Sequence, residues 1–173
     1  MTSVLIAKII ALDKKLNSHL VAFRKLWLLK ITRIVTWLGS GAFLATVYVF
    51  IFFFCQRALR PFVIALVVAE LAGLLMVIAL RYLTRRERPR ADFTARILAP
   101  WNRYSFPSLH TARMFMLTVM VGTHYRELFL FMLSVAIVIG FTRIYLERHY
   151  LSDVLAGVAI GCIAAVVSLS INV

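Results

Sequence analysis

Long uncharged runs are the feature of this sequence that most limits what it can fold into. Three of them cover residues 34–56, 61–80 and 154–173, and only Glu70 interrupts the second. Each run is long enough to cross a hydrocarbon core about 30 Å thick as a helix. The chain is also 62% hydrophobic, which excludes an ordinary soluble domain. The sequence therefore predicts a single all-α integral membrane domain over residues 1–173.

Two shorter apolar segments complete the predicted helical bundle. One runs from Ser108 to about Gly122, and the other from Leu128 to about Leu146. Each carries one arginine close to an end, where a long side chain reaches the membrane interface. We therefore expect five spans within residues 34–173, with motif-bearing loops at 81–110 and 142–153.

The first 33 residues are expected to lie on the membrane rather than cross it. Charged side chains interrupt every apolar run there, while apolar residues recur every three or four positions. That pattern predicts an amphipathic helix in the interface plane, broken near Asn17 and Ser18. A secretory signal peptide would need an uninterrupted apolar core and a cleavage site, which this segment lacks. A sixth, weakly hydrophobic span is the other alternative.

Counting spans brings three separate motifs to one membrane face. Five spans with short connections put four of their ends on the same side, at Arg81, Ser108, Arg143 and Asp153. The segment before the first span reaches the membrane from that side as well. The topology therefore predicts a single site built from residues far apart in the chain.

His149 and Asp153 are the candidate nucleophile and its partner. They lie four residues apart at the start of the last span and so share a helix face. A carboxylate that binds one ring nitrogen fixes the tautomer and leaves the other nitrogen free to attack phosphorus. The alternative is an aspartate that only complements the helix dipole, with a histidine nearby by chance.

Arginines supply the candidate phosphate ligands, namely Arg81, Arg88 and Arg143. Guanidinium forks match phosphate oxygens and stabilise charge in a phosphoryl-transfer transition state. Any single arginine at a span end is more commonly explained by contact with lipid headgroups. The loop after the second span holds more positive charge than one phosphate requires. Its candidate headgroup contacts are Arg85, Arg86, Arg90 and Arg103, and Arg96 adds to the charge.

Ser108 and His110 follow Pro107 at the expected start of a span. Free backbone amides and a serine hydroxyl at a helix N-terminus favour an anion. His110 in the first turn is placed to protonate a leaving oxygen and later to take a proton from attacking water. A plain helix cap and an interfacial histidine are the alternative interpretation of this pair.

Together, the motifs resemble a known family. The first motif is Arg81, six residues and Arg88-Pro89; the second is Pro107-Ser108-x-His110; the third is Arg143, five residues, His149, three residues and Asp153. The three motifs resemble the three-part signature of the type 2 phosphatidic acid phosphatase superfamily. The resemblance implies a helical-bundle phosphatase that needs no metal or other cofactor. In it three arginines bind phosphate, Ser108 assists, His110 is the general acid, and the nucleophilic pair is His149 with Asp153.

The sequence departs from that signature at three positions. Arg81 stands where the family usually has Lys, Thr142 where it has Ser, and Leu109 where it has Gly. The first two keep a charge and a hydroxyl, whereas Leu109 adds bulk close to the phosphate. Among members this small, bacterial lipid A 1-phosphatases look most similar, followed by undecaprenyl diphosphate and phosphatidylglycerophosphate phosphatases.

A membrane lipid phosphate or diphosphate is the expected substrate, with anionic lipids as partners. A site at span ends is reached most easily by a headgroup whose tail stays in the bilayer. Despite the net charge of +13, nucleic acid is not an expected partner, because the basic residues lie near membrane boundaries. A lipid-to-lipid phosphotransferase and a non-catalytic lipid-binding protein are the functional alternatives.

The resemblance implies a bacterial inner-membrane protein whose site faces the periplasm. The basic residues of the motif face would by themselves place that face in the cytoplasm. Three further features receive structural interpretations: Glu70 as a protonated or hydrogen-bonded packing residue, Gly157 and Gly161 as close-packing positions, and Cys55 and Cys162 as free thiols.

Overall fold

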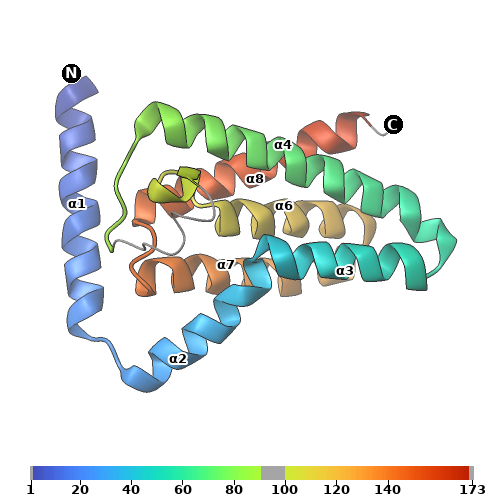
Figure 1. The fold of residues 1–173 in the computed structure, drawn as a ribbon, viewed down its shortest axis with the longest axis horizontal. Helices are drawn as coiled ribbons and strands as arrows, with labels where there is room; N and C mark the ends of the chain where they lie inside the picture. The colour runs from blue at the N-terminus through green and yellow to red at the C-terminus, as the bar shows by residue number, and fades with distance from the viewer. Residues whose placement is uncertain (1, 91–99, 172–173) are drawn as a thin grey trace.

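The computed structural model describes residues 2–90 and 100–171, and its regular elements in those ranges are all helices. They are α1 (Thr2–Ala22), α2 (Leu26–Val35), η1 (Thr36–Gly39), α3 (Gly41–Phe54), η2 (Arg57–Leu59), α4 (Arg60–Thr84), η3 (Pro100–Arg103), α6 (Leu109–His124), η4 (Arg126–Leu128), α7 (Phe129–Tyr145) and α8 (Leu151–Ile171). Figure 1 shows α3, α4, α6, α7 and α8 running along the long axis, while α1 stands across one end of this bundle.

The chain is a multi-pass membrane protein. In the described residues, three segments are long and apolar enough to span a membrane: 57–84, 126–145 and 151–171. A fourth span results if Leu26–Gly39 and Gly41–Phe54, which meet at a 48° bend, are counted together. The inner helix α6 has 16 residues, a length of about 24 Å. The five-span count stays a prediction.

The first predicted span, residues 34–56, is not one continuous helix. Ser40 has an extended backbone, and its hydroxyl accepts a hydrogen bond from Phe43 N, so it caps a new helix. Gly39 lies against α6 and α7, where an added Cβ would sit 3.0 Å from Ile139 and 3.3 Å from His110. The helix therefore breaks at the Ser40 cap, beside the close contact of Gly39. Neither residue carries a charge, so the apolar run in the sequence gives no sign of the break.

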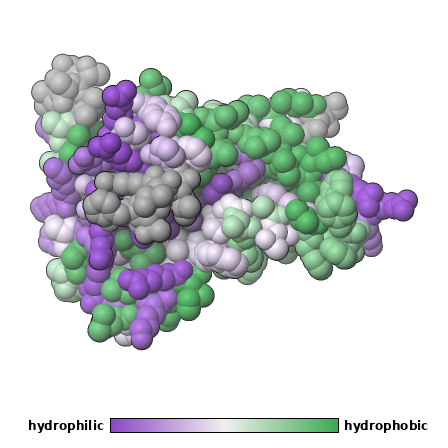
Figure 2. All heavy atoms as spheres, viewed as in Figure 1, coloured by the Kyte–Doolittle hydropathy of each residue, from purple (hydrophilic) through white to green (hydrophobic). Residues whose placement is uncertain are grey.

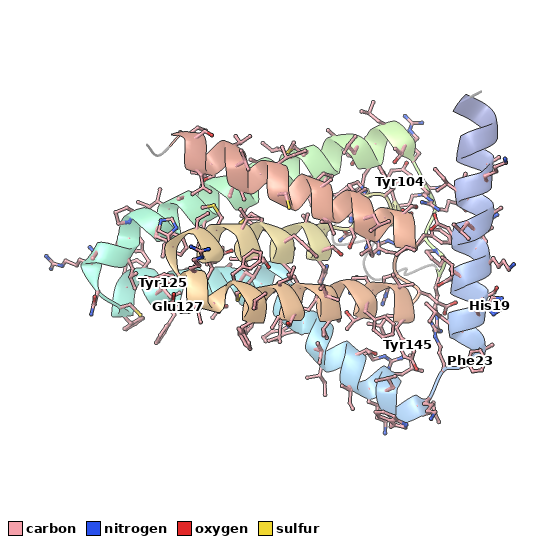
Figure 3. All side chains as sticks on the ribbon, turned by 180° about the vertical axis from the view of Figure 1, so that it is seen from behind. His19, Phe23, Tyr104, Tyr125, Glu127 and Tyr145 are labelled. Atoms are coloured by element: carbon pink, nitrogen blue, oxygen red, sulfur yellow. The ribbon has the colours of Figure 1, made fainter. Side chains whose placement is uncertain are left out.

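The predicted break near Asn17 and Ser18 is also wrong. α1 continues through these residues, because Asn17 faces the protein and the Ser18 hydroxyl bonds to the Lys15 carbonyl within the helix. The turn comes at 23–25 instead, where Lys25 N donates to the hydroxyl of Tyr145 at the end of α7 (3.0 Å). Figure 3 shows Phe23 and Tyr145 in this corner.

α1 presents its polar side to the protein and its apolar side outward. Asp13 and Asn17 are buried, whereas Ile9, Leu12 and Leu16 are exposed. A helix with this arrangement, lying across the end of the bundle (Figure 1), has its apolar side chains available to lipid. The geometry is the one expected of an interfacial helix.

α6 lies in the middle of the bundle and packs against α4, α7 and α8. Its contact with α8 depends on two glycines: a Cβ at Gly157 would lie 2.6 Å from the Ser108 carbonyl oxygen, and one at Gly161 would lie closer still to the Ala112 carbonyl oxygen. The prediction that both glycines serve close helix packing is confirmed. Because α6 begins at Leu109, this packing sets the position of the PSLH motif relative to the start of α8.

Candidate active site

The motif residues meet in one cavity at the end of the bundle crossed by α1. Its volume is about 840 Å³, and its walls include Arg81, Arg88, His110, Arg143 and His149. α4, α6 and α7 supply three of these, while Arg88 and His149 come from the connections that follow α4 and α7. Figure 2 shows hydrophilic residues gathered at this end of the molecule and hydrophobic ones over much of the bundle.

The backbone before α6 fixes the ring of His149. Its Nδ1 lies 2.7 Å from the carbonyl oxygen of Ser105. A carbonyl oxygen only accepts hydrogen bonds, so Nδ1 carries the proton and Nε2 keeps its lone pair. The backbone amides of Arg148 and His149 both donate to the Arg143 carbonyl, which folds the short connection back onto α7. The tautomer is therefore the one that a nucleophilic Nε2 requires.

Asp153 does not make the expected direct hydrogen bond to His149. Its Oδ2 lies 3.7 Å from Nδ1, and the shorter contacts of the carboxylate are to Arg86 (2.8 Å) and the Tyr150 backbone amide (2.9 Å). The tautomer is set by Ser105 instead. Asp153 lies fully buried behind the ring, where its charge supports positive charge on the imidazole.

The sequence predicted that Arg86 contacts the lipid headgroup, but Arg86 is paired with two aspartates of the protein. Its guanidinium bridges Asp153 and Asp13, with N–O distances of 2.8 and 2.7 Å, and stacks on the ring of Tyr150 at 4.3 Å. It does not line the cavity. The side chain is held by protein groups, so we revise its role from headgroup contact to support of Asp153.

Asp13 of α1 completes this network. It is 4% exposed, and besides Arg86 it accepts hydrogen bonds from the backbone amide of Ser152 (3.1 Å) and from the Ser152 hydroxyl. The carboxylate thus caps the first turn of α8. Sequence reasoning did not single out Asp13, although it is the only acidic residue before Glu70.

Each motif arginine is held by the protein through part of its guanidinium. Arg81 donates to Asn102 Oδ1 (2.9 Å) and to the Pro107 carbonyl, and Arg88 Nε donates to the Asn102 carbonyl (2.7 Å). Arg143 donates to the hydroxyl of Thr36 (2.8 Å), and its buried Nε has no partner among the described residues. Three cations fixed in this way can surround one phosphate.

The PSLH motif contributes differently from expectation. Ser108 is fully buried and outside the cavity lining; its hydroxyl accepts from Thr111 (3.0 Å), and its backbone amide donates to the Asp153 carbonyl (3.0 Å). Leu109 does line the cavity and is mostly buried against Val77. Ser108 therefore ties α6 to α8, and Leu109 supplies the bulk that the sequence predicted.

The other candidate headgroup contacts separate into two groups. Arg90 lines the cavity. Arg85 is exposed and bonds to the Tyr82 carbonyl, and Arg103 stacks on Tyr104, so neither reaches the cavity wall. Arg96 lies outside the described residues.

Among the described residues that line the cavity, eight are arginines and none carries a carboxylate. The arginines are Arg24, Arg33, Arg81, Arg88, Arg90, Arg113, Arg143 and Arg148. Burial, followed by Arg88, Arg143 and Arg81, holds the pKa of His149 well below its usual value. The arginines therefore disfavour the protonated form of this imidazole and attract anions.

Arg113 is the partner of the partly buried glutamate of α4. Its Nε makes an ion pair with Glu70, which confirms the interpretation of Glu70 as a hydrogen-bonded packing residue. Arg113 lies one turn after His110 on α6, and a Cβ on Gly41 would sit 2.7 Å from its NH2. The same-face spacing of His110 and Arg113 is the signal that would have placed Arg113 in the site.

The described residues contain no group of three or more histidine, cysteine, aspartate or glutamate side chains that could hold a metal ion. Both described cysteines, Cys55 and Cys162, are free thiols as predicted. The chemistry available in the cavity is that of two histidines and a set of guanidinium groups.

Known proteins share this fold. The profile described as PAP2 superfamily matches residues 61–172. A phosphatidylglycerolphosphate phosphatase of PAP2 type from Bacillus subtilis superposes with a TM-score of 0.78 at 21% identity, covering 95% of this chain and 86% of its own. LpxE from Aquifex aeolicus superposes with a TM-score of 0.73 at 26% identity, covering 90% and 93%. None of the curated protein sequences matches the chain.

Proposed function

Because this chain belongs to the PAP2 superfamily, we propose that it is a membrane lipid phosphatase that works through a phosphohistidine at His149. The observation that carries the proposal is the hydrogen bond from Nδ1 to the Ser105 carbonyl, which leaves Nε2 unprotonated in a cavity lined by arginines. A neutral ring nitrogen beside guanidinium groups is suited to attack a bound phosphate.

In the first step, Arg81, Arg88 and Arg143 bind the phosphate oxygens. Nε2 of His149 attacks phosphorus, and the bond between phosphorus and the lipid oxygen breaks. Protonated His110, which lines the same cavity, gives its proton to that oxygen, so the lipid leaves as an alcohol or as a shorter phosphate. The phosphorylated ring carries positive charge, which the Ser105 carbonyl and the Asp153 carboxylate support.

Water completes the cycle in the second step. Neutral His110 takes a proton from the water while the water oxygen attacks phosphorus. The P–N bond breaks and its electron pair returns to Nε2 of His149. Inorganic phosphate then leaves. The same residues would pass phosphate to a lipid hydroxyl if one replaced water, so a lipid-to-lipid phosphotransferase is the second candidate function.

Lipid A 1-phosphate is the substrate that we favour, with undecaprenyl diphosphate and phosphatidylglycerophosphate next. LpxE, a lipid A 1-phosphatase, and the Bacillus phosphatase both share the fold over most of this chain. The arginine surplus supports a headgroup with more negative charge than a single phosphate. A non-catalytic lipid-binding protein would keep the cavity without turnover.

We place the protein in a bacterial inner membrane, with the cavity facing the periplasm. Cys55 is exposed at the end of α3, away from the cavity (Figure 1), and therefore reports the topology. An impermeant maleimide added to intact spheroplasts should leave Cys55 unlabelled until the membrane is opened. Labelling from the periplasmic side would reverse the orientation.

Phosphate release from a lipid panel tests the function. Purified protein is assayed with lipid A, undecaprenyl diphosphate, phosphatidylglycerophosphate and phosphatidic acid, each beside the His149→Ala variant. Release that depends on His149 supports a phosphatase and ranks the substrates. A phosphorylated acceptor lipid without free phosphate would instead identify a transferase, and no product from any lipid would contradict both.

A further inference from the structure

The cavity holds more cationic groups than one phosphate requires, and two of them have no partner among the described residues. Arg24 pairs with Glu147, and Arg113 pairs with Glu70. By contrast, Arg33 and Arg90 line the cavity as exposed side chains whose guanidinium groups make no hydrogen bond or ion pair within residues 2–90 and 100–171. Unpaired cations in a cavity whose described lining residues include no carboxylate form a binding site for an anion.

α2 presents Arg33 directly beside the phosphate ligands. Leu29, Arg33 and Thr36 all line the cavity, at a spacing that places them on one face of the helix. Thr36 accepts the hydrogen bond that holds Arg143 (2.8 Å). Arg33 lies three residues before Thr36, about 4.5 Å along the helix axis.

Arg90 reaches the cavity from the connection that follows α4. Its backbone amide donates to the Glu147 carbonyl (3.1 Å), two residues before His149, and it follows the phosphate ligand Arg88 by two residues. The connection after α4 is therefore held against the connection before α8. Arg33 and Arg90 thus belong to segments that are each tied to the reacting centre.

We propose that Arg33 and Arg90 form a second anion subsite, which binds a second phosphate of the substrate headgroup while His149 attacks the first. This inference rests on the proposed function and deepens it. The substrate is then a lipid with two phosphate groups, either joined as a diphosphate or separated within one headgroup. The negative charge of a second phosphate also offsets the mutual repulsion of the arginines. This favours binding of a bisphosphorylated lipid over a lipid with one phosphate.

Matched substrate pairs test the subsite with the full-length protein in detergent micelles. Farnesyl phosphate and farnesyl diphosphate share a tail, as do phosphatidic acid and phosphatidylglycerophosphate. Arg33→Gln and Arg90→Gln should each lower kcat/KM for the bisphosphorylated member roughly 10-fold more than for its monophosphate partner, the loss expected for one charge-assisted hydrogen bond. Selective loss with farnesyl diphosphate identifies a joined diphosphate, and selective loss with phosphatidylglycerophosphate identifies separated phosphates.

Arg57→Gln is the matched control, because Arg57 is exposed at the opposite end of the bundle. The substitution removes one positive charge, as Arg33→Gln and Arg90→Gln do. In each substrate pair, it should leave the ratio of kcat/KM for the bisphosphorylated lipid to kcat/KM for its monophosphate partner unchanged. Equal losses for both members of each pair would overturn the subsite and leave the phosphatase proposal intact. Absence of turnover by the wild-type protein on these four lipids and on lipid A and undecaprenyl diphosphate would instead contradict the proposed function.

A binding measurement keeps the subsite testable without turnover. In the His149→Ala background, methylenediphosphonate should bind more tightly than methylphosphonate, and Arg33→Gln should remove most of that difference. Equal affinity for the two phosphonates, with or without Arg33, would overturn the proposal. An Arg33 effect that appears only in micelles containing anionic lipid would also overturn it, by assigning Arg33 to bulk lipid.

Discussion

Nδ1 of His149 donates to the carbonyl oxygen of Ser105 at 2.7 Å, while the Asp153 carboxylate lies 3.7 Å away. The backbone, rather than the acidic partner four residues later, selects the tautomer. A main-chain carbonyl stays an acceptor at every pH, so the proton on Nδ1 is retained whenever the ring is neutral. Nε2 is then available for attack irrespective of the charge on Asp153.

His149→Ala should abolish turnover while leaving anion binding measurable. Removal of a nucleophile lowers kcat by roughly 1,000-fold or more, whereas the arginine side chains that bind phosphate remain. Phosphate release measures the first effect, and vanadate binding by calorimetry measures the second. Turnover near the wild-type rate would remove His149 as the nucleophile, and the vanadate titration separates that outcome from misfolding.

The acid limb of the pH profile should lie below the usual histidine range. Burial and the neighbouring Arg88, Arg143 and Arg81 lower the pKa of His149, so the ring stays neutral until the pH falls below about 6.5. The free enzyme is active only with a neutral ring, so a lowered pKa extends kcat/KM toward acid pH. A profile of log kcat/KM against pH gives the position of this limb.

Arg88→Gln provides the internal comparison for that profile. Arg88 is the largest electrostatic cause of the lowered pKa, so its removal should raise the pKa of His149 and move the acid limb to higher pH. The titration of the substrate phosphate is the same for both proteins and cancels in the difference. An unshifted limb would show that the limb reports a group other than His149.

Activity should persist when metal ions are removed. The proposed steps use two histidines and guanidinium groups, with no residue assigned to a metal. Phosphate release is measured in EDTA and again after dialysis against a chelating resin, with Mg²⁺ added back as the control. Loss of activity that Mg²⁺ restores would contradict the histidine mechanism in its metal-free form.

Asp13→Asn should lower kcat more than it changes KM. The substitution keeps the size of the side chain but removes the charge that holds Arg86 against Asp153. Loss of one partner of a buried charged contact corresponds to about a tenfold effect, felt at the His149 ring rather than at the phosphate-binding arginines. Steady-state kinetics on a lipid phosphate give both constants.

Lys14→Gln is the control for Asp13, since Lys14 is exposed on the same helix. Asp13→Glu should restore part of the lost kcat, because it returns the charge. If Asp13→Asn changed only thermal stability, α1 would be an anchor without influence on the reacting residues.

The sequence predicted which motif residues meet in one cavity better than it predicted the contacts around them. Arg81, Arg88, His110, Arg143 and His149 meet in one cavity, because the helix order alone brings those helix ends and connections together. Their partners were not predictable in the same way. Ser105 acts through a backbone carbonyl, which has no sequence signature.

The N-terminal segment shows the same limit. Its amphipathic pattern located a helix but not its contacts, since the break after Ala22 is set by Lys25 and Arg24 meeting the end of α7. Asp13 bonds to residues far along the chain, and Ser40 begins a helix inside an apolar run. Such contacts depend on tertiary packing, which a hydropathy pattern does not encode.

Gly161→Ala should destabilise the protein, whereas Gly73→Ala should not. A Cβ at Gly161 would overlap the carbonyl oxygen of Ala112, which is backbone and cannot move aside, so α8 must shift away from α6. Such overpacking costs about 1–3 kcal/mol. At Gly73 the new Cβ would meet only the Ala164 Cβ at 3.5 Å, an ordinary contact, and alanine favours the helix by up to about 1 kcal/mol. Thermal unfolding in detergent should therefore give a lower Tm for Gly161→Ala and an unchanged or higher Tm for Gly73→Ala; equal Tm values would mean that the α6–α8 contact is looser than described.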